Sequence, residues 1–282
     1  MGERPERDER HRAAAGRGGA RAEDPRRRAR RALLTRLSDV SDNRAYVTYS
    51  ASDGVAHIEL ARPEFGNTLD LTMTHQLRDA VQRALRSHTV DVLELTSTGG
   101  DFCVGTDTEA ARQADDPTTQ VFEQAAALDE MFGILNASTK PVIAGVQGLA
   151  AGSGLGIALA ADICLCTPDA TFRVAPHGGL GAPDPGLAWQ LPRAIGQQRA
   201  LSFALGRRTI DATTAESWGV VTVVEGDLPA AVDGIARSLT GEGLWANGET
   251  RRLLRASWDT DRTSLAQSEA ATMVRAMLRA KV

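Results

Sequence analysis

The segment from Arg173 to Trp189, RVAPHGGLGAPDPGLAW, combines two titratable side chains with a high density of turn-forming residues. It holds four glycines and three prolines, and its titratable residues are His177 and Asp184. Prolines fix the backbone and glycines permit tight turns, so we expect a rigid loop that holds Asp184 in place. A carboxylate held there could act as a nucleophile or move a proton. The alternative for Asp184 is that it is only a turn former. His177 is a further catalytic candidate, for which we favour a hydrogen-bonding role that holds the shape of the loop.

Two glycine-rich turns, GGDFCVGTDT at 99–108 and GLAAGSGLG at 148–156, each follow an apolar strand pattern. Small residues let a ligand approach the backbone and leave N–H groups free to bind it. The second turn opens a helix, whose unpaired first-turn N–H groups favour negative charge. If both turns meet at one carbonyl oxygen they form an oxyanion hole, in which one donor contributes about 3–4 kcal/mol. Tight packing alone is the other explanation. The acidic residue of a dinucleotide fingerprint is missing, so no such cofactor is expected.

The surrounding pattern predicts the elements that position these turns. Residues 45–62 alternate around Asp53 and Gly54, which predicts a two-stranded hairpin. Apolar residues at helical spacing predict a helix within 69–88, and another is expected over 118–136. Short apolar strands are expected at 90–97, 141–148 and 163–167, and connections of this length imply parallel pairing through right-handed crossovers. From Gly186 onward the pattern is helical except for GVVTVVEG at 219–226.

Composition limits the class of protein. The chain has 282 residues, of which 42% are hydrophobic, and no run approaches the ~20 apolar residues of a membrane span. It therefore folds as one large domain or as one domain with a small appendage. Its three cysteines, Cys103, Cys164 and Cys166, have no disulfide-framework spacing. We therefore expect a reducing, cytoplasmic location and no metal site.

Charge is unevenly distributed along the chain. Residues 1–38 carry a net charge of +6 and the remainder carries −10. The basic segment could bind nucleic acid or another anionic partner. We favour a disordered extension, because this segment has few residues able to build a core, and we expect no nucleic-acid partner.

Several linked motifs resemble those of the enoyl-CoA hydratase/isomerase (crotonase) family. They are RPEFGNTLD, GGDFCVGTD, KPVIAGVQGLAAGSGLGIALAADICLCTPDATF and LPRAIGQQRALSFALGRRTIDATTAESWGVV, and with their spacing they cover about residues 44–279. The resemblance implies an α/β crotonase (ClpP-like) fold of repeated ββα units with a C-terminal helical trimerisation region. We expect an Arg-rich extension at 1–40, the core at 41–205 and the helical region at 206–282. A homotrimer or hexamer is expected.

The resemblance also assigns residues to an acyl-CoA site. The N–H groups of Thr106 and Ser153 would hold the thioester oxygen while an enolate-like intermediate forms. Coenzyme A, as part of the substrate rather than a separate cofactor, would be bound around five residues. These are Arg62, Phe65, Cys103, Gly105 and Gly152.

Departures from the family pattern bear on the reaction. The two glutamates of an ordinary hydratase are replaced by Gly156 and by Pro176, or by His177 if the loop is shifted by one residue. The loop is instead similar to the 4-chlorobenzoyl-CoA dehalogenase branch, whose nucleophilic aspartate falls on Asp184. That branch's catalytic histidine falls on Asp129 and its tryptophan on Pro176, which argues against true dehalogenation. Asp129 and Asp184 could form an acid–base pair at one pocket, unless Asp129 is simply an exposed helix residue.

These observations lead to one expected activity and one alternative. The expected activity is the processing of an acyl-CoA, an aroyl-CoA or a carrier-bound thioester. Isomerase, hydrolase or lyase chemistry is favoured over ordinary hydration, because both glutamates are absent. The alternative is a non-catalytic acyl-CoA-binding homologue that kept the fold. The identity of the acyl group does not follow from the sequence.

Overall fold

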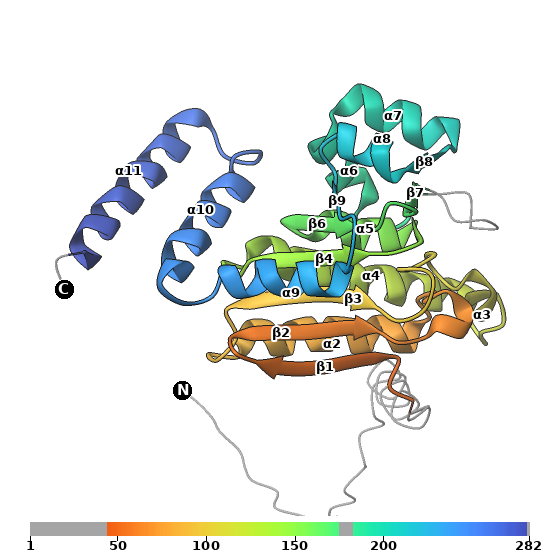
Figure 1. Cartoon of the computed structure of the whole chain (residues 1–282). Helices are drawn as coiled ribbons and strands as arrows, with labels where there is room; N and C mark the ends of the chain where they lie inside the picture. The colour runs from red at the N-terminus through yellow and green to blue at the C-terminus, as the bar shows by residue number, and fades with distance from the viewer. Residues whose placement is uncertain (1–43, 175–182, 281–282) are drawn as a thin grey trace, which may run out of the picture. The chain divides into compact units, whose positions relative to one another are not determined.

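The computed structural model describes residues 44–174 and 183–280. The Arg-rich extension predicted at 1–40, together with Pro176 and His177, lies outside these residues. Most described strands form one six-stranded sheet in the order β1-β2-β3-β4-β6-β9 (Figure 1). Its strands are β1 (Val47–Ser52), β2 (Val55–Leu60), β3 (Val92–Ser97), β4 (Val142–Val146), β6 (Ile163–Cys166) and β9 (Thr222–Val223).

The predicted hairpin and the predicted parallel strands are confirmed. β1 and β2 pair antiparallel across a tight turn in which Asp53 and Gly54 have φ of 50° and 82°. Two consecutive positive φ values match the type I′ turn that suits the twist of a hairpin. From β2 onward each neighbouring pair in the sheet is parallel, because helices form the crossovers between the strands.

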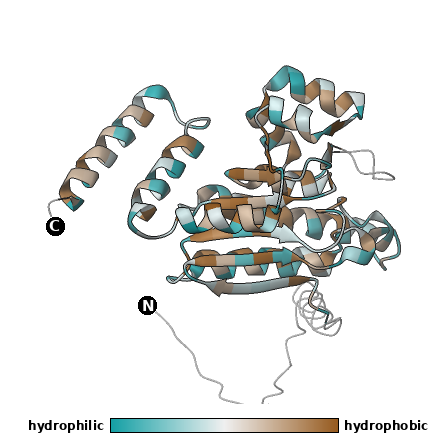
Figure 2. Cartoon of the chain, viewed as in Figure 1, coloured by the Kyte–Doolittle hydropathy of each residue, from teal (hydrophilic) through white to brown (hydrophobic). Residues whose placement is uncertain are grey.

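Helices cover both faces of this sheet (Figure 1). On one face, α2 (Leu71–Arg86) and α4 (Pro117–Ala137) bury Leu77 and Leu128 in the larger core cluster. On the other face, α9 (Leu228–Ser238) packs Val232 against apolar strand residues. The inner strands are correspondingly hydrophobic (Figure 2). Cys164 and Cys166 both belong to the larger cluster, as their alternation along one strand predicts.

A small second sheet lies next to the predicted glycine turns. It consists of β5 (Leu149–Ala151), β7 (Thr171–Arg173) and β8 (Thr209–Asp211), in the order β5-β7-β8. β8 interrupts a region for which the sequence pattern indicates helix. Its three residues pair with β7, a long-range contact that no local periodicity encodes. The remaining central helices are α3 (Thr108–Arg112), α5 (Ser153–Ala160), α6 (Leu187–Ile195), α7 (Gln197–Gly206) and α8 (Ala212–Ser217).

The chain continues into two long helices, α10 (Leu244–Ala256) and α11 (Arg262–Arg279). Arg251 anchors α10 to the core. Its guanidinium lies 2.6 Å from Asp162 and donates to the carbonyls of Ser138 and Leu135 at the end of α4. α11 contacts α10, and none of its residues is buried. Among the described residues, no helix is both long and apolar enough to cross a membrane.

Candidate active site

Three chain segments lie side by side at the carboxyl end of β3. Leu69 forms a parallel bridge with Thr106, accepting from Asp107 N at 2.8 Å and donating to Gly105 O at 2.9 Å. Cys103 forms a second parallel bridge, with Ala150. The two glycine-rich turns predicted to converge are therefore joined through the backbone.

Glycine is required where these two turns touch. A Cβ on Gly154 would lie 2.1 Å from the carbonyl oxygen of Cys103, far inside contact distance. Gly152 precedes the first turn of α5 with φ of 54° and ψ of −123°, a conformation that favours glycine. These glycines let α5 begin directly beside the 103–107 segment. The N-terminus of α5 then faces Thr106, whose Oγ1 lies 2.9 Å from Ser153 Oγ.

The backbone N–H groups of Thr106 and Ser153 differ in what they bind. Gly105 and Asp107 direct their backbone groups to Leu69, so the Thr106 N–H points away from Leu69. Within 44–174 and 183–280, no hydrogen bond uses this N–H. The Ser153 N–H instead donates to Oδ2 of Asp184 at 2.6 Å. Among the described residues, one predicted oxyanion donor therefore has no acceptor and the other holds a carboxylate.

The Asp184 carboxylate is held by both turns. Its Oδ2 accepts from Ser153 Oγ at 2.9 Å and from Thr106 Oγ1 at 3.4 Å, in addition to the Ser153 N–H. Ser153 is the first residue of α5, so the positive end of that helix favours the negative charge. Asp184 lies between Pro183 and Pro185 and is partly buried, just before α6. The structure thus places Asp184 at the predicted oxyanion donors.

Asp129 takes no part in the hydrogen bonds that hold the Asp184 carboxylate. It is exposed on α4 and lines a cavity of about 330 Å³ with Phe132, Gly186 and Gln190. The structure describes no hydrogen bond between Asp129 and Asp184. The predicted acid–base pair stays a prediction.

Gly156, the position at which the sequence predicts the loss of one hydratase glutamate, lies next to Phe132 and Pro185. A Cβ at this position would lie 3.4 Å from Phe132 Cζ and 3.4 Å from the carbonyl oxygen of Pro185. Both distances are ordinary van der Waals contacts, so a longer side chain at this position would have Phe132 and the Pro185 carbonyl as its nearest neighbours.

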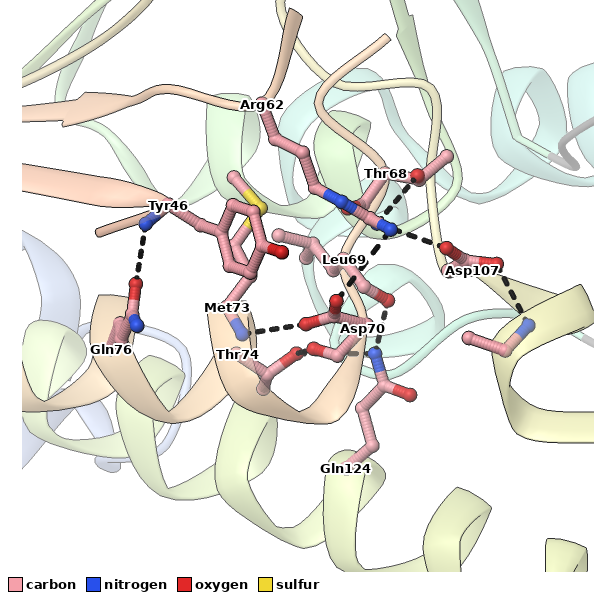
Figure 3. A network of polar contacts seen from close by, with 11 residues as sticks. Tyr46, Arg62, Thr68, Leu69, Asp70, Met73, Thr74, Gln76, Asp107 and Gln124 are labelled. Carbon is pink, nitrogen blue, oxygen red and sulfur yellow. Dashed lines mark hydrogen bonds and ion pairs between the residues drawn. The ribbon is translucent and has the colours of Figure 1, made fainter. Parts of the chain in front are cut away.

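Arg62 forms the centre of a network that positions the first turn (Figure 3). It is only 7% exposed, and its Nη1 donates to Asp107 Oδ2 at 2.9 Å and to the Thr68 carbonyl at 2.9 Å. Its Nη2 lies 3.6 Å from Asp70. Phe65, which is 54% exposed, stacks on the guanidinium at 4.4 Å. Two carboxylates already balance the charge of Arg62, so these contacts describe a positioning role.

Two of the residues in this network were not anticipated from the sequence. Asp70 accepts from Met73 N at the start of α2, and Asp107 accepts from Ala110 N at the start of α3. An aspartate directly before a helix is a recognisable N-cap signal, which could have identified them. Arg62 thus ties two helix caps to the segment that carries Thr106. Gln124 on α4 supports the neighbouring segment, which carries Leu69, by donating to the Leu69 carbonyl at 2.5 Å (Figure 3).

The cysteines are packing residues. Cys103 is fully buried, and burial raises the pKa of its thiol to about 12, so the thiol is protonated near neutral pH. A ligand would meet Cys103, Gly105 and Gly152 chiefly through their backbone atoms. Among the described residues, no group of three or more His, Cys, Asp or Glu side chains could hold a metal ion.

Comparison with known proteins gives consistent matches. The family model for enoyl-CoA hydratase/isomerase matches residues 50–278. A 4-chlorobenzoyl coenzyme A dehalogenase of an Arthrobacter species is 33% identical over 72% of this chain and 74% of the relative. The 1,2-epoxyphenylacetyl-CoA isomerase of Escherichia coli is 31% identical over 72% and 79%. A solved structure described as an enoyl-CoA hydratase/isomerase candidate from Mycobacterium abscessus is 36% identical, covers 81% of this chain and 90% of its own, and has a TM-score of 0.72.

Proposed function

The chain belongs to the enoyl-CoA hydratase/isomerase family of acyl-CoA-processing enzymes, and we propose that it stabilises the oxyanion of a thioester intermediate with the N–H groups of Thr106 and Ser153. Support comes from the two backbone bridges, which bring both turns to one place. Support also comes from α5, because its N-terminal end favours negative charge beside Ser153.

One observation carries the proposal: a carboxylate oxygen of Asp184 lies 2.6 Å from the Ser153 N–H. An anionic oxygen at this point stands in for the oxyanion of the intermediate. The substrate oxygen must therefore displace Asp184 Oδ2 before both donors can bind it. The displaced carboxylate would remain beside the acyl group, because Pro183 and Pro185 restrain its backbone.

From that position Asp184 is proposed to act as base or nucleophile. It would remove a proton from the carbon next to the thioester, leaving the electron pair on the oxyanion, or attack an acyl-bound carbon. Isomerase, hydrolase and lyase chemistry fit such a residue. Ordinary hydration does not fit, because the positions expected to carry its two glutamates hold Gly156 and Pro176, or His177 if the loop is shifted by one residue.

The substrate is proposed to be a thioester of an aromatic or aliphatic acyl group. The thiol partner is proposed to be CoA or an acyl carrier. The names of the two relatives above refer to 4-chlorobenzoyl-CoA and 1,2-epoxyphenylacetyl-CoA, which are aromatic thioesters. Aromatic acyl-CoAs are therefore the first substrates to test. Coenzyme A is proposed to lie near the exposed ring of Phe65 and the backbone at Gly105 and Gly152.

A second function is favoured by the same geometry. If Asp184 never leaves the Ser153 N–H and no other acid–base group compensates for Gly156, the chain would bind acyl-CoA without turning it over. This alternative keeps the fold and the CoA site and removes only the chemistry.

Substitution of Asp184 separates the two functions. Asp184→Ala frees the Ser153 N–H, so an unreactive acyl-CoA analogue should bind several-fold more tightly than to the wild type. Asp184→Asn leaves an uncharged amide oxygen, which competes with the substrate oxygen for the Ser153 N–H more weakly than a carboxylate does. Its gain in analogue binding should therefore be smaller than that of Asp184→Ala. If Asp184 is catalytic, both variants should lose about 10²–10⁴-fold in kcat.

The measurements are calorimetric affinities for the analogue and turnover of a panel of aliphatic and aromatic acyl-CoAs. Asp129→Asn is the matched control and should cost much less, because Asp129 is exposed. Unchanged turnover in Asp184→Ala would remove the catalytic role. Tighter binding with no turnover by any protein, wild type included, would favour the binding homologue.

The assembly is proposed to be a homotrimer or a hexamer. The observation that supports self-association is an uncovered apolar stripe on α11, formed by Met273, Val274, Met277 and Leu278, which are 58–70% exposed. Apolar residues recur along this helix (Figure 2).

A further inference from the structure

A second cavity lies on the opposite side of the main sheet from α2 and α4. On the face that α9 covers, Val55 and Val92 are apolar and pack against that helix. Two residues further along each strand the same face becomes polar, because His57 of β2 pairs in register with Glu94 of β3. Side chains two residues apart on a strand share a face, so Glu59 and Thr96 follow on the same side.

This polar part of the sheet forms the floor of a cavity of about 680 Å³, with the start of α9 as its wall. Four carboxylates line it and no lysine or arginine does so among the described residues. The carboxylates belong to Glu59, Glu94, Asp227 and Asp233.

Glu94 is the unusual member of this set. It is 4% exposed, and its Oε2 lies 2.6 Å from His57 Nδ1. Its Oε1 is buried and has no hydrogen-bond partner among the described residues. Burial raises the pKa of this carboxyl. A desolvated carboxylate oxygen without a donor is unfavourable, and a bound donor would remove that cost.

Two of the other carboxylates already have partners. Asp227 caps α9 by accepting from Ala230 N, and Asp233 pairs with Arg237 at 2.8 Å. Among the described residues, Glu59 has one long contact, 3.4 Å, from Thr48 Oγ1. Glu94 and Glu59 are therefore the two carboxylates of this set that are left for a ligand.

We propose that this cavity binds an organic cation through a guanidinium group. Glu59 and Glu94 occupy diagonal positions on adjacent strands, which places their backbones about 7–8 Å apart, and their side chains can converge on one ligand. A planar guanidinium presents five N–H donors that can reach both carboxylates. A metal ion fits less well, because no group of three ligating side chains occurs among the described residues. The residues that contact Asp184 do not line this cavity, so the site is separate from the thioester site.

Agmatine is a suitable probe, with N-carbamoylputrescine as its control, because this control replaces the guanidinium with an uncharged urea of nearly the same shape and keeps the terminal ammonium. We expect agmatine to bind the full chain measurably in calorimetry and the urea to bind at least 10-fold more weakly. Glu94→Gln should weaken agmatine at least 10-fold. Glu59→Gln, at a half-buried position, should weaken it several-fold and gives a second variant if Glu94→Gln does not fold.

Glu269→Gln is the matched control, because it removes the same charge from α11, outside the cavity, and should leave agmatine binding unchanged. Equal binding of agmatine and the urea, or agmatine binding that neither Glu94→Gln nor Glu59→Gln weakens, would overturn the proposal, and so would the absence of agmatine binding.

The source of the guanidinium is tested with N-acetylarginine N-methylamide. Weaker binding of this peptide-like ligand than of agmatine identifies a free small cation as the ligand. Equal or tighter binding identifies an arginine side chain of a protein.

Discussion

The Ser153 N–H can bind one oxygen strongly at a time, and in this structure that oxygen belongs to Asp184. The arrangement differs from an empty oxyanion hole, because the chain supplies its own anion to a donor predicted to serve the substrate. The consequence at the residue scale is a competition. Any change that weakens the hold of Ser153 and Thr106 on the carboxylate should favour thioester binding at the same donors.

Ordinary hydration should be absent or very slow. A general acid or base contributes about 10²–10⁴-fold, and the positions predicted for the two glutamates hold Gly156 and Pro176, or His177 if the loop is shifted by one residue. We therefore expect crotonyl-CoA hydration, followed by loss of absorbance of the enoyl thioester, to stay near background at high enzyme concentration. A rate typical of a hydratase would show that another side chain replaces the glutamates.

Arg62 should matter for both stability and ligand binding. Arg62→Met would leave Asp107 and Asp70 without the cation between them, and removing one partner of a buried ion pair costs about 3–5 kcal/mol. We expect a loss of this order in chemical unfolding, and weaker acyl-CoA binding because the Thr106 segment loses its support. Arg112→Met, an exposed residue on α3, should change stability by less than about 1 kcal/mol. Equal effects of the two substitutions would contradict a positioning role for Arg62.

The resemblance to the family assigned Thr106, Ser153 and Asp184 to one site, whereas the local glycines and prolines marked only the separate turns that carry them. The Arg62 network could not be predicted in the same way. Arg62 and Asp107 are 45 residues apart, and only the folded backbone brings them to 2.9 Å. Nor could the sequence indicate that the carboxylate of Asp184 would occupy the Ser153 N–H.

At the scale of elements, long periodic segments were predictable and short ones were not. The helix expected within 69–88 is α2, and the one expected over 118–136 is α4 at 117–137. Their apolar periodicity extends over several turns, so the signal is strong. β7 and β8 have three residues each and depend on pairing with each other and with β5. Such strands carry too few residues to show an alternation.

The junction of α10 and α11 should respond to acid. Glu249 on α10 accepts from Arg252 at 2.8 Å, from Arg275 at 2.7 Å and from Thr272 at 3.1 Å. The hydrogen bond from Arg252, with those from Arg275 and Thr272, lowers the pKa of Glu249 to about 2. Because the pKa of Glu249 is lower in the folded state than in the unfolded chain, its ionised carboxylate stabilises the folded state at pH values above its ordinary pKa. That contribution is lost as pH falls from about 4.5 to about 2.

Glu249→Gln should therefore destabilise the chain near neutral pH by about 1 kcal/mol after screening by solvent. The difference in unfolding free energy from the wild type should shrink as pH falls through this window. Hydrogen exchange at pH 7 should become faster in α11 and stay unchanged in the main sheet. Glu269→Gln on α11 is the control, and an equal effect of this substitution would contradict a specific role for Glu249.

At the scale of the whole molecule, the uncovered apolar residues gather on the last two helices. Leu254 and Trp258, at the end of α10 and just beyond it, are 67% and 64% exposed, and the apolar stripe of α11 is similarly uncovered. Among the described elements, α10 is the one against which α11 packs most extensively. Exposed apolar surface of this extent marks contact sites between proteins, and self-association through closed symmetry is the commonest way to cover it.

A charge placed on this stripe should prevent assembly. We expect the wild type to have a mass in sedimentation equilibrium of three or six chains. Met273→Asp combined with Met277→Asp should reduce it to one chain, because two carboxylates cannot be buried in an apolar contact without a large cost. Leu205→Asp is the matched control, since Leu205 is 78% exposed on α7 and should leave the mass unchanged. A wild type that sediments as a single chain at micromolar concentration would contradict the proposed trimer. If the double variant keeps its mass, the contact must lie on another face.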